Sequence, residues 1–187
     1  MIQTDYVLDA KGLSCPLPIV KTKKALNKLE PGQVLEIQAT DKGSLADLRT
    51  WAERTGHQYL GTKEEGTVLR HYVRKAGTET DEEKKFPHVI DNDELQKRLQ
   101  TGEKLTVIDV REPAEYAFSH IPGAISIPLG ELDARMEELE QDAAFYIICR
   151  TGNRSDLAAR RLSERGFVHV TNVVPGMSAW TGPTTQQ

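Results

Sequence analysis

The sequence predicts two domains of different fold class: an N-terminal two-layer α+β domain and a C-terminal α/β domain. Its 187 residues are enough for two small cores. Residues 74–85 lack large apolar side chains and are dense in charge, as expected of a solvated linker. Net charge also changes sign along the chain: residues 1–75 carry 12 Lys and Arg against 9 Asp and Glu, and the remainder carries 12 against 19. We therefore expect domains at 1–75 and 87–187, joined by a charged linker at 76–86.

The N-terminal domain is predicted from alternating strand and helix patterns. Proline tolerates the first helical turn, so Pro16 should open a helix that buries Val20 and Leu26. Residues 34–40 alternate apolar and polar, as in a half-buried strand, and Ser44 begins a capping-box pattern. The expected βαβαββ elements are strand 6–10, a helix from Pro16, strand 34–40, a helix from Ser44 to Gly56, and strands 57–60 and 67–73.

The C-terminal domain is predicted from strands that alternate with helices. Asp91 is suited to cap a first helix that ends at Gly102. Uniformly apolar strands such as 145–148 indicate a parallel sheet covered by helices on both faces. The expected elements after the first helix are strand 105–108, a helix from Pro113, strand 124–127, a helix through Leu132 and Met136, strand 145–148, helix 155–165, strand 168–170 and a terminal turn at 176–180.

Composition excludes several classes of protein. Hydrophobic residues make up 38% and charged residues 28%, which fits a globular chain. The longest apolar run, 143–149, is far shorter than the roughly 20 residues of a membrane span, and the N-terminus has no signal-like stretch, so we expect a cytoplasmic protein. Two cysteines provide no disulfide framework, the histidines are not grouped at metal-ligand spacings, and no basic–aromatic pattern points to nucleic acid. We expect no metal, no organic cofactor, no membrane and no direct nucleic-acid partner.

Cys15 is the first candidate site residue. It stands immediately before the helix opened by Pro16, where the helix dipole and free backbone donors favour a thiolate. A small buried residue at a helix cap is the alternative. The first 75 residues resemble the TusA-like (SirA-like) sulfur carrier family, and this resemblance implies that Cys15 carries a persulfide. It is carried by the run Leu8-Asp9-Ala10-Lys11-Gly12-Leu13-Ser14-Cys15-Pro16-Leu17-Pro18, by Thr22 and Ala25, and by Thr40-Asp41.

Cys149 is the second candidate. It follows a buried strand directly, at the carboxyl end where ligands bind in parallel sheets. The short polar loop after it can point backbone N–H groups inward as an anion-binding nest, with Gly152 permitting the turn. Arg150 and Arg154 can add charge-assisted hydrogen bonds to a substrate. The expected substrate-binding residues are Arg150, Thr151, Gly152, Asn153, Arg154 and Ser155.

The second half resembles a single rhodanese domain. This resemblance implies sulfurtransferase activity, with Cys149 as the persulfide-forming nucleophile and its loop as the substrate cradle. Asp109 and Arg111 are expected to support the wall of the site and His120 to be structural rather than a general base, while Ser119 departs from the usual glycine. The motifs are Asp109-Val110-Arg111-Glu112-Pro113-Ala114-Glu115-Tyr116, His120-Ile121-Pro122-Gly123-Ala124, Cys149-Arg150-Thr151-Gly152-Asn153-Arg154-Ser155 and Gly176-Met177-Ser178-Ala179-Trp180.

Together the halves suggest a sulfur relay. Cys149 would take sulfane sulfur from thiosulfate or a low-molecular-weight persulfide and pass it to Cys15 for delivery to a downstream thiol or protein acceptor. Transfer within a chain and transfer between chains both fit the sequence, which leaves the oligomeric state open. A sulfide or redox sensor, or a sulfur-carrier interaction protein, without turnover is the non-enzymatic alternative. A Cdc25-like phosphatase is a further alternative. It is disfavoured because that class has an active loop one residue longer, whereas here Arg154 is the sixth residue when Cys149 is counted as the first.

Overall fold

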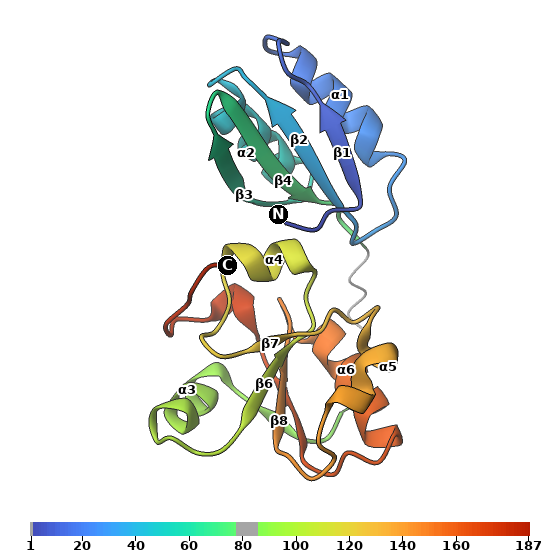
Figure 1. The fold of residues 1–187 in the computed structure, drawn as a ribbon, viewed down its shortest axis with the longest axis vertical. Helices are drawn as coiled ribbons and strands as arrows, with labels where there is room; N and C mark the ends of the chain where they lie inside the picture. The colour runs from blue at the N-terminus through green and yellow to red at the C-terminus, as the bar shows by residue number, and fades with distance from the viewer. Residues whose placement is uncertain (1, 78–85) are drawn as a thin grey trace. The chain divides into compact units, whose positions relative to one another are not determined.

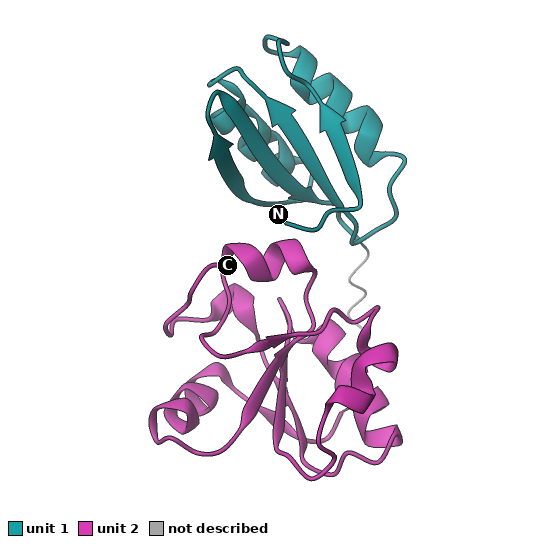
Figure 2. Cartoon of the chain, in the orientation of Figure 1, with its two compact units in different colours: residues 1–78 teal, residues 79–187 magenta. Residues whose placement is uncertain are grey.

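The computed structural model describes residues 2–77 and 86–187, which fall into two compact units, 1–78 and 79–187 (Figure 2). Most of the linker expected at 76–86 is formed by residues 78–85, which lie outside the described residues. No helix in the described ranges is long and apolar enough to cross a membrane.

The N-terminal unit is a four-stranded mixed sheet with two helices on one face (Figure 1), as the fold class predicted. The strand order is β1-β2-β4-β3, with β1 and β2 parallel and the other pairs antiparallel. Its elements are β1 (Tyr6–Asp9), α1 (Leu17–Leu26), β2 (Val34–Ala39), α2 (Ser44–Arg54), β3 (Gln58–Glu65) and β4 (Val68–Arg74).

Two local expectations for this unit are wrong. Val20 is 45% exposed, whereas α1 turns Leu26, as predicted, and Ala25 toward the core. Ser44 does not cap α2: Gly43 is the N-cap residue in helical conformation, so Ser44 already belongs to the first turn. The Ser44 hydroxyl instead lies 2.9 Å from Nε2 of the buried His71.

The C-terminal unit is an all-parallel five-stranded sheet of order β5-β9-β8-β6-β7, with helices on both faces (Figure 1). Along β8, Ile147 packs in one core and Tyr146 and Ile148 in the other, which confirms burial on both faces. The elements are β5 (Val89–Ile90), α3 (Asn92–Gln100), β6 (Thr106–Asp109), α4 (Pro113–Phe118), β7 (Ile125–Ser126), α5 (Leu132–Arg135), β8 (Phe145–Ile148), α6 (Asn153–Glu164) and β9 (Val170–Val173), with short 3-10 turns η1 (Met136–Glu138) and η2 (Met177–Ala179).

Element boundaries in this unit shift in three places. The two-residue edge strand β5 was not expected, and β9 begins at Val170 because Val168 is 67% exposed. Asp91 caps α3 as predicted, accepting a hydrogen bond from the Glu94 amide at 2.8 Å. Helix α6 begins at Asn153, two residues earlier than expected, and this places Ser155 in its first turn.

Candidate functional site

Cys149 is a buried free cysteine directly after the central strand β8, at its carboxyl end. Its Sγ accepts hydrogen bonds from the Gly152 amide at 3.1 Å and from the Ser155 hydroxyl at 3.3 Å. Both donors stabilise negative charge on the sulfur. Gly152 has φ +100°, a conformation that favours glycine and that turns the loop sharply before α6. The early start of α6 therefore brings a side-chain donor to Cys149 in addition to the backbone.

A second chain segment, η2, holds the cysteine loop through backbone hydrogen bonds. The Met177 amide donates to the Cys149 carbonyl at 2.8 Å, and the Ser178 amide donates to the Arg150 carbonyl at 2.9 Å. These bonds satisfy two carbonyls at the end of a buried strand, which would otherwise lack partners. The main chain of η2 thus fixes the position of the loop.

Gly176 allows this close approach. Its φ is +84°, and a Cβ at this position would lie 2.4 Å from the Cys149 carbonyl oxygen. Asn92 on α3 holds Gly176 from the other side: its Nδ2 donates to the Gly176 carbonyl at 2.9 Å, and its Oδ1 accepts the Gly176 amide at 3.2 Å. Asn172 on β9 donates to the Gly152 carbonyl at 3.2 Å. Two buried asparagines therefore connect the loop to the sheet and to α3.

Arg154 is paired inside the protein. Its guanidinium makes a two-point ion pair with Glu115 of α4, with Nη1 2.8 Å from Oε2 and Nη2 3.1 Å from Oε1. Burial alone would lower the pKa of Arg154, but the charge and hydrogen bonds of Glu115 outweigh it and raise the pKa above its ordinary value. The charge of Arg154 is thus largely balanced by Glu115, and the pair fixes the first turn of α6 to α4.

Asp109, Arg111 and His120 are buried, and Asp109 ends β6, the strand that pairs with β8. Arg111 Nη2 lies 2.6 Å from Asp109 Oδ2 and 2.7 Å from the Ser119 carbonyl. Ser119, which stands where the family usually has glycine, therefore contacts Arg111 through its backbone. His120 stacks on Tyr116 at 3.7 Å between ring centroids, and its Nδ1 lies 2.7 Å from the Tyr116 carbonyl. The contacts of all three residues are those of packing and positioning groups.

Cys15 is exposed, in the loop between β1 and α1. Two hydrogen bonds attach the loop to β2 and to the residue that follows it. The Ala10 amide donates to the Gln38 carbonyl at 2.8 Å, and the Gly12 amide donates to the Thr40 hydroxyl at 2.9 Å. A solvent-facing sulfur on a fixed loop is accessible to another protein.

The electrostatic surroundings of Cys15 differ from the expectation. Helix α1 begins at Leu17 with Pro16 as its N-cap residue, so Cys15 precedes the helix rather than capping it. A hydrogen bond to Asp47 raises the pKa of the Cys15 thiol above its ordinary value, and desolvation and the charges of Asp47 and Asp41 act in the same direction. This direction is opposite to the prediction that the position favours the thiolate.

Comparisons with known proteins identify both units. Residues 6–75 match the family model "Sulfurtransferase TusA", and residues 91–183 match the model "Rhodanese-like domain". The chain is 51% identical over 184 residues to "Putative sulfur carrier protein YrkF" of Bacillus subtilis, covering 98% of this chain and 100% of the relative. The chain belongs to the family of sulfur carriers that join a TusA domain to a rhodanese domain.

Two further comparisons each cover about half of this chain. "Putative sulfurtransferase YtwF" of Bacillus subtilis is 42% identical over 90 residues, which are 48% of this chain and 86% of the relative. The crystal structure of a rhodanese-like domain protein from Staphylococcus aureus superposes with a TM-score of 0.51 at 29% identity, covering 54% of this chain and 98% of that one.

Sequence reasoning missed residues that act on the two cysteines from a distance along the chain. Asn92 hydrogen-bonds Gly176, next to the η2 segment that supports the cysteine loop. Glu115 pairs with Arg154 although the two are 39 positions apart. Asp47 was noticed only as part of a capping pattern, yet it contacts Cys15. Of the other predicted loop residues, Thr151 lies half-buried two positions after Cys149, and Asn153 lies half-buried at the first position of α6.

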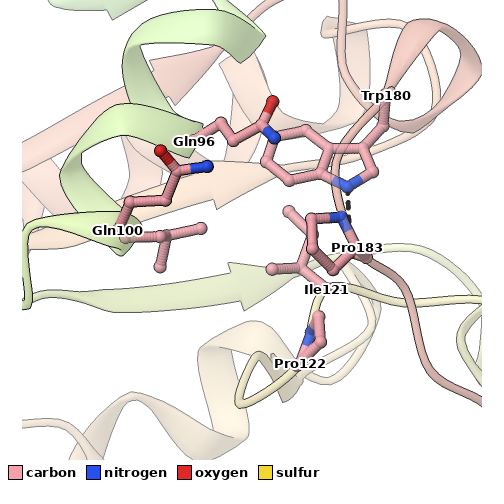
Figure 3. Close-up of a pocket in the computed structure, with 7 residues that line it drawn as sticks. Gln96, Gln100, Ile121, Pro122, Trp180 and Pro183 are labelled. Carbon is pink, nitrogen blue, oxygen red and sulfur yellow. Dashed lines mark hydrogen bonds between the residues drawn. The ribbon is translucent and has the colours of Figure 1, made fainter.

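A groove on the rhodanese domain lies beside η2, the segment that supports the cysteine loop (Figure 3). Trp180 forms part of its wall, and the Trp180 indole donates to the Pro183 carbonyl at 3.1 Å. Its lining contains no cysteine and no ionisable side chain, so this groove supplies no nucleophile or proton carrier. The lining residues are Gln96, Leu99, Gln100, Ile121, Pro122, Trp180 and Pro183.

Proposed function

We propose that the protein is a sulfurtransferase in which Cys149 accepts sulfane sulfur and Cys15 carries it onward to an acceptor. The observation that most supports the proposal is the pair of donors on the buried Cys149 sulfur, the Gly152 amide and the Ser155 hydroxyl. They stabilise this sulfur both as an attacking thiolate and as a leaving group. The exposure of Cys15 suits the delivering end of the pathway.

In the first step, the Cys149 thiolate attacks the outer sulfur of thiosulfate or of a low-molecular-weight persulfide. A new S–S bond forms at Cys149 while the donor's S–S bond breaks. With thiosulfate, sulfite leaves with the electron pair of the broken bond, and Cys149 is left as a persulfide anion. No metal or organic cofactor is needed, because the thiol itself forms the covalent intermediate.

In the second step, Cys15 attacks the outer sulfur of the Cys149 persulfide. The Cys15 S–S bond forms as the Cys149 S–S bond breaks, and the proton of the Cys15 thiol ends on the transferred sulfur. Cys149 leaves as a thiolate and is ready for another cycle. Because both cysteines belong to one chain, the tether raises their effective concentration, to the mM range for a short flexible linker.

The relay is tested by persulfide mapping. Reduced protein is incubated with thiosulfate, and the gain of one sulfur atom is measured by mass spectrometry on each cysteine-containing peptide. We expect persulfide on both cysteines of the wild type, on Cys149 alone in Cys15→Ser, and on neither in Cys149→Ser. Equal labelling of Cys15 in the wild type and in Cys149→Ser would refute the relay.

Turnover separates the proposal from the sensor alternative. With excess thiosulfate and a thiol acceptor, the sulfurtransferase releases sulfite steadily. A sensor stops after about one equivalent per reactive cysteine, because nothing removes the bound sulfur. Mixing Cys15→Ser with Cys149→Ser distinguishes the two routes: label on Cys15 in the mixture identifies transfer between chains.

A further inference from the structure

The pocket that holds Cys15 is lined by two carboxylates. Asp41 precedes α2 and Asp47 lies in its first turn, and both line one small depression with Cys15 and Ser44. Both carboxylates raise the pKa of the Cys15 thiol, Asp47 more than Asp41. The carrier sulfur therefore sits next to negative charge, whereas the Cys149 sulfur faces an amide and a hydroxyl that donate to it.

Neither carboxylate is neutralised within the described part of the chain. No ion pair joins Asp41 or Asp47 to a cation there, and Asp41 accepts a hydrogen bond from the Gly43 amide at 3.1 Å. The charges that act on Cys15 are those of these two aspartates. His71 lies behind Ser44, but burial lowers the pKa of His71 to about 4, so it adds no positive charge near neutral pH.

We propose that Asp41 and Asp47 are specificity-determining residues that make the carrier thiol reject small anions. Resting on the sulfurtransferase proposal above, this inference assigns the two cysteines different partners. Anionic donors such as thiosulfate load Cys149, while Cys15 exchanges sulfur with thiols and persulfides that other protein groups present. The same charges keep released sulfite from attacking the persulfide on Cys15, which would otherwise return the sulfur to thiosulfate.

The test compares two alkylating reagents of the same chemistry and different charge. In the full-length Cys149→Ser protein, Cys15 is the only thiol. The rate constants of Cys15 with neutral iodoacetamide and with anionic iodoacetate are measured. The ratio used below is the iodoacetamide rate constant divided by the iodoacetate rate constant. Both reagents react with the thiolate, so the thiolate fraction of Cys15, which Asp47→Asn would change, cancels in the ratio. The ratio therefore reports only the effect of reagent charge.

We expect the ratio in the folded protein to exceed that in the same protein unfolded in urea. Asp41→Asn and Asp47→Asn should each lower the ratio by about threefold, as expected for one unit charge a few ångströms away in a watery site. Salt near 1 M, where the screening length is only about 3 Å, should remove most of the excess. Glu53→Gln, at the far end of α2, is the matched control and should leave the ratio unchanged.

An equal ratio in wild type and both aspartate variants, or a ratio that salt does not change, would overturn the inference. Circular dichroism of each variant verifies that the TusA domain stays folded, and the two single variants provide independent tests. The readout involves no sulfur transfer, so the relay and the anion rejection can fail separately. If Asp41→Asn and Asp47→Asn also increase direct thiosulfate labelling of Cys15 in the Cys149→Ser chain, the same charges control the sulfur donor.

Discussion

Substituting Gly176 by alanine should disturb the rhodanese site although residue 176 supplies no catalytic group. The added Cβ would lie 2.4 Å from the Cys149 carbonyl oxygen and 3.1 Å from the Arg150 carbonyl oxygen. Both atoms belong to the backbone at the end of the central strand, so neither can move aside as a flexible side chain does. Either η2 or the peptide after Cys149 must shift.

The expected cost has two parts. A non-glycine residue at this combination of dihedral angles, φ +84° and ψ −158°, costs about 1–3 kcal/mol. Displacing the packed backbone adds about 2 kcal/mol, comparable to overpacking a core. A total near 4 kcal/mol should lower the melting temperature of the rhodanese domain by more than about 10 °C, since 1 kcal/mol corresponds to about 4–8 °C for a domain of this size.

Calorimetry of the full-length protein measures this shift, and Gly123→Ala is the matched control. Gly123 also has a positive φ, +81°, but a Cβ there would meet nothing within 4 Å. The control should cost only the strain of a left-handed residue, about 1–2 kcal/mol. Persulfide formation at Cys149 should slow at least about tenfold in Gly176→Ala, because a displaced loop misaligns its donors, and by less than about twofold in the control. Equal losses of stability and rate in the two variants would refute the argument from close contact.

Three further outcomes follow from buried polar groups. Glu115→Gln leaves Arg154 with only the more distant carboxylate of Glu112, at 3.9 Å, and should destabilise the rhodanese domain by about 3–5 kcal/mol in calorimetry; a loss under about 1 kcal/mol would contradict a structural ion pair. Ser155→Ala removes one donor from the Cys149 sulfur. It should slow persulfide formation about tenfold with little change in melting temperature. A rate within about twofold of wild type would show that the hydroxyl is unimportant. His71 folds in its neutral form with its pKa lowered from 6.5 to about 4 by burial, so the stability it contributes is complete above pH 6.5 and is lost as the pH falls toward 4. Urea unfolding of the TusA domain should show about 2.5 kcal/mol of this loss between pH 7 and 4.5, and His71→Gln should flatten that slope; an unchanged slope would assign it to other groups.

Much of the fold could be predicted from local patterns. The apolar strand at 145–148 and the cap at Asp91 were placed correctly, because strand burial and helix capping depend on neighbouring residues. The position of Ser44 was not predicted correctly. Gly43 occupies the N-cap position, and the Ser44 hydroxyl contacts His71 on β4, which is distant in the sequence.

The two cysteines were found for a similar reason, but their surroundings were not. The polar loop after Cys149 and the proline after Cys15 are local signals. The effect of Asp47 on Cys15 depends on how α2 packs beside α1, and the hold of Asn92 on Gly176 spans 84 positions. Helix-dipole reasoning at Cys15 did not include Asp47 and Asp41, whose hydrogen bond and charges raise the pKa of its thiol.

The shape of the cysteine loop is held mainly by main-chain atoms: the amides of Met177 and Ser178 fix its carbonyls, and the Gly152 amide reaches the sulfur. Backbone groups are common to all non-proline residues, so this arrangement tolerates changes of side chain at the loop's outer positions. We therefore expect exchange of Arg150 to leave the position of the Cys149 sulfur unchanged. The rhodanese domain thus offers protein engineers a loop whose side chains can be altered separately from the backbone that positions its cysteine.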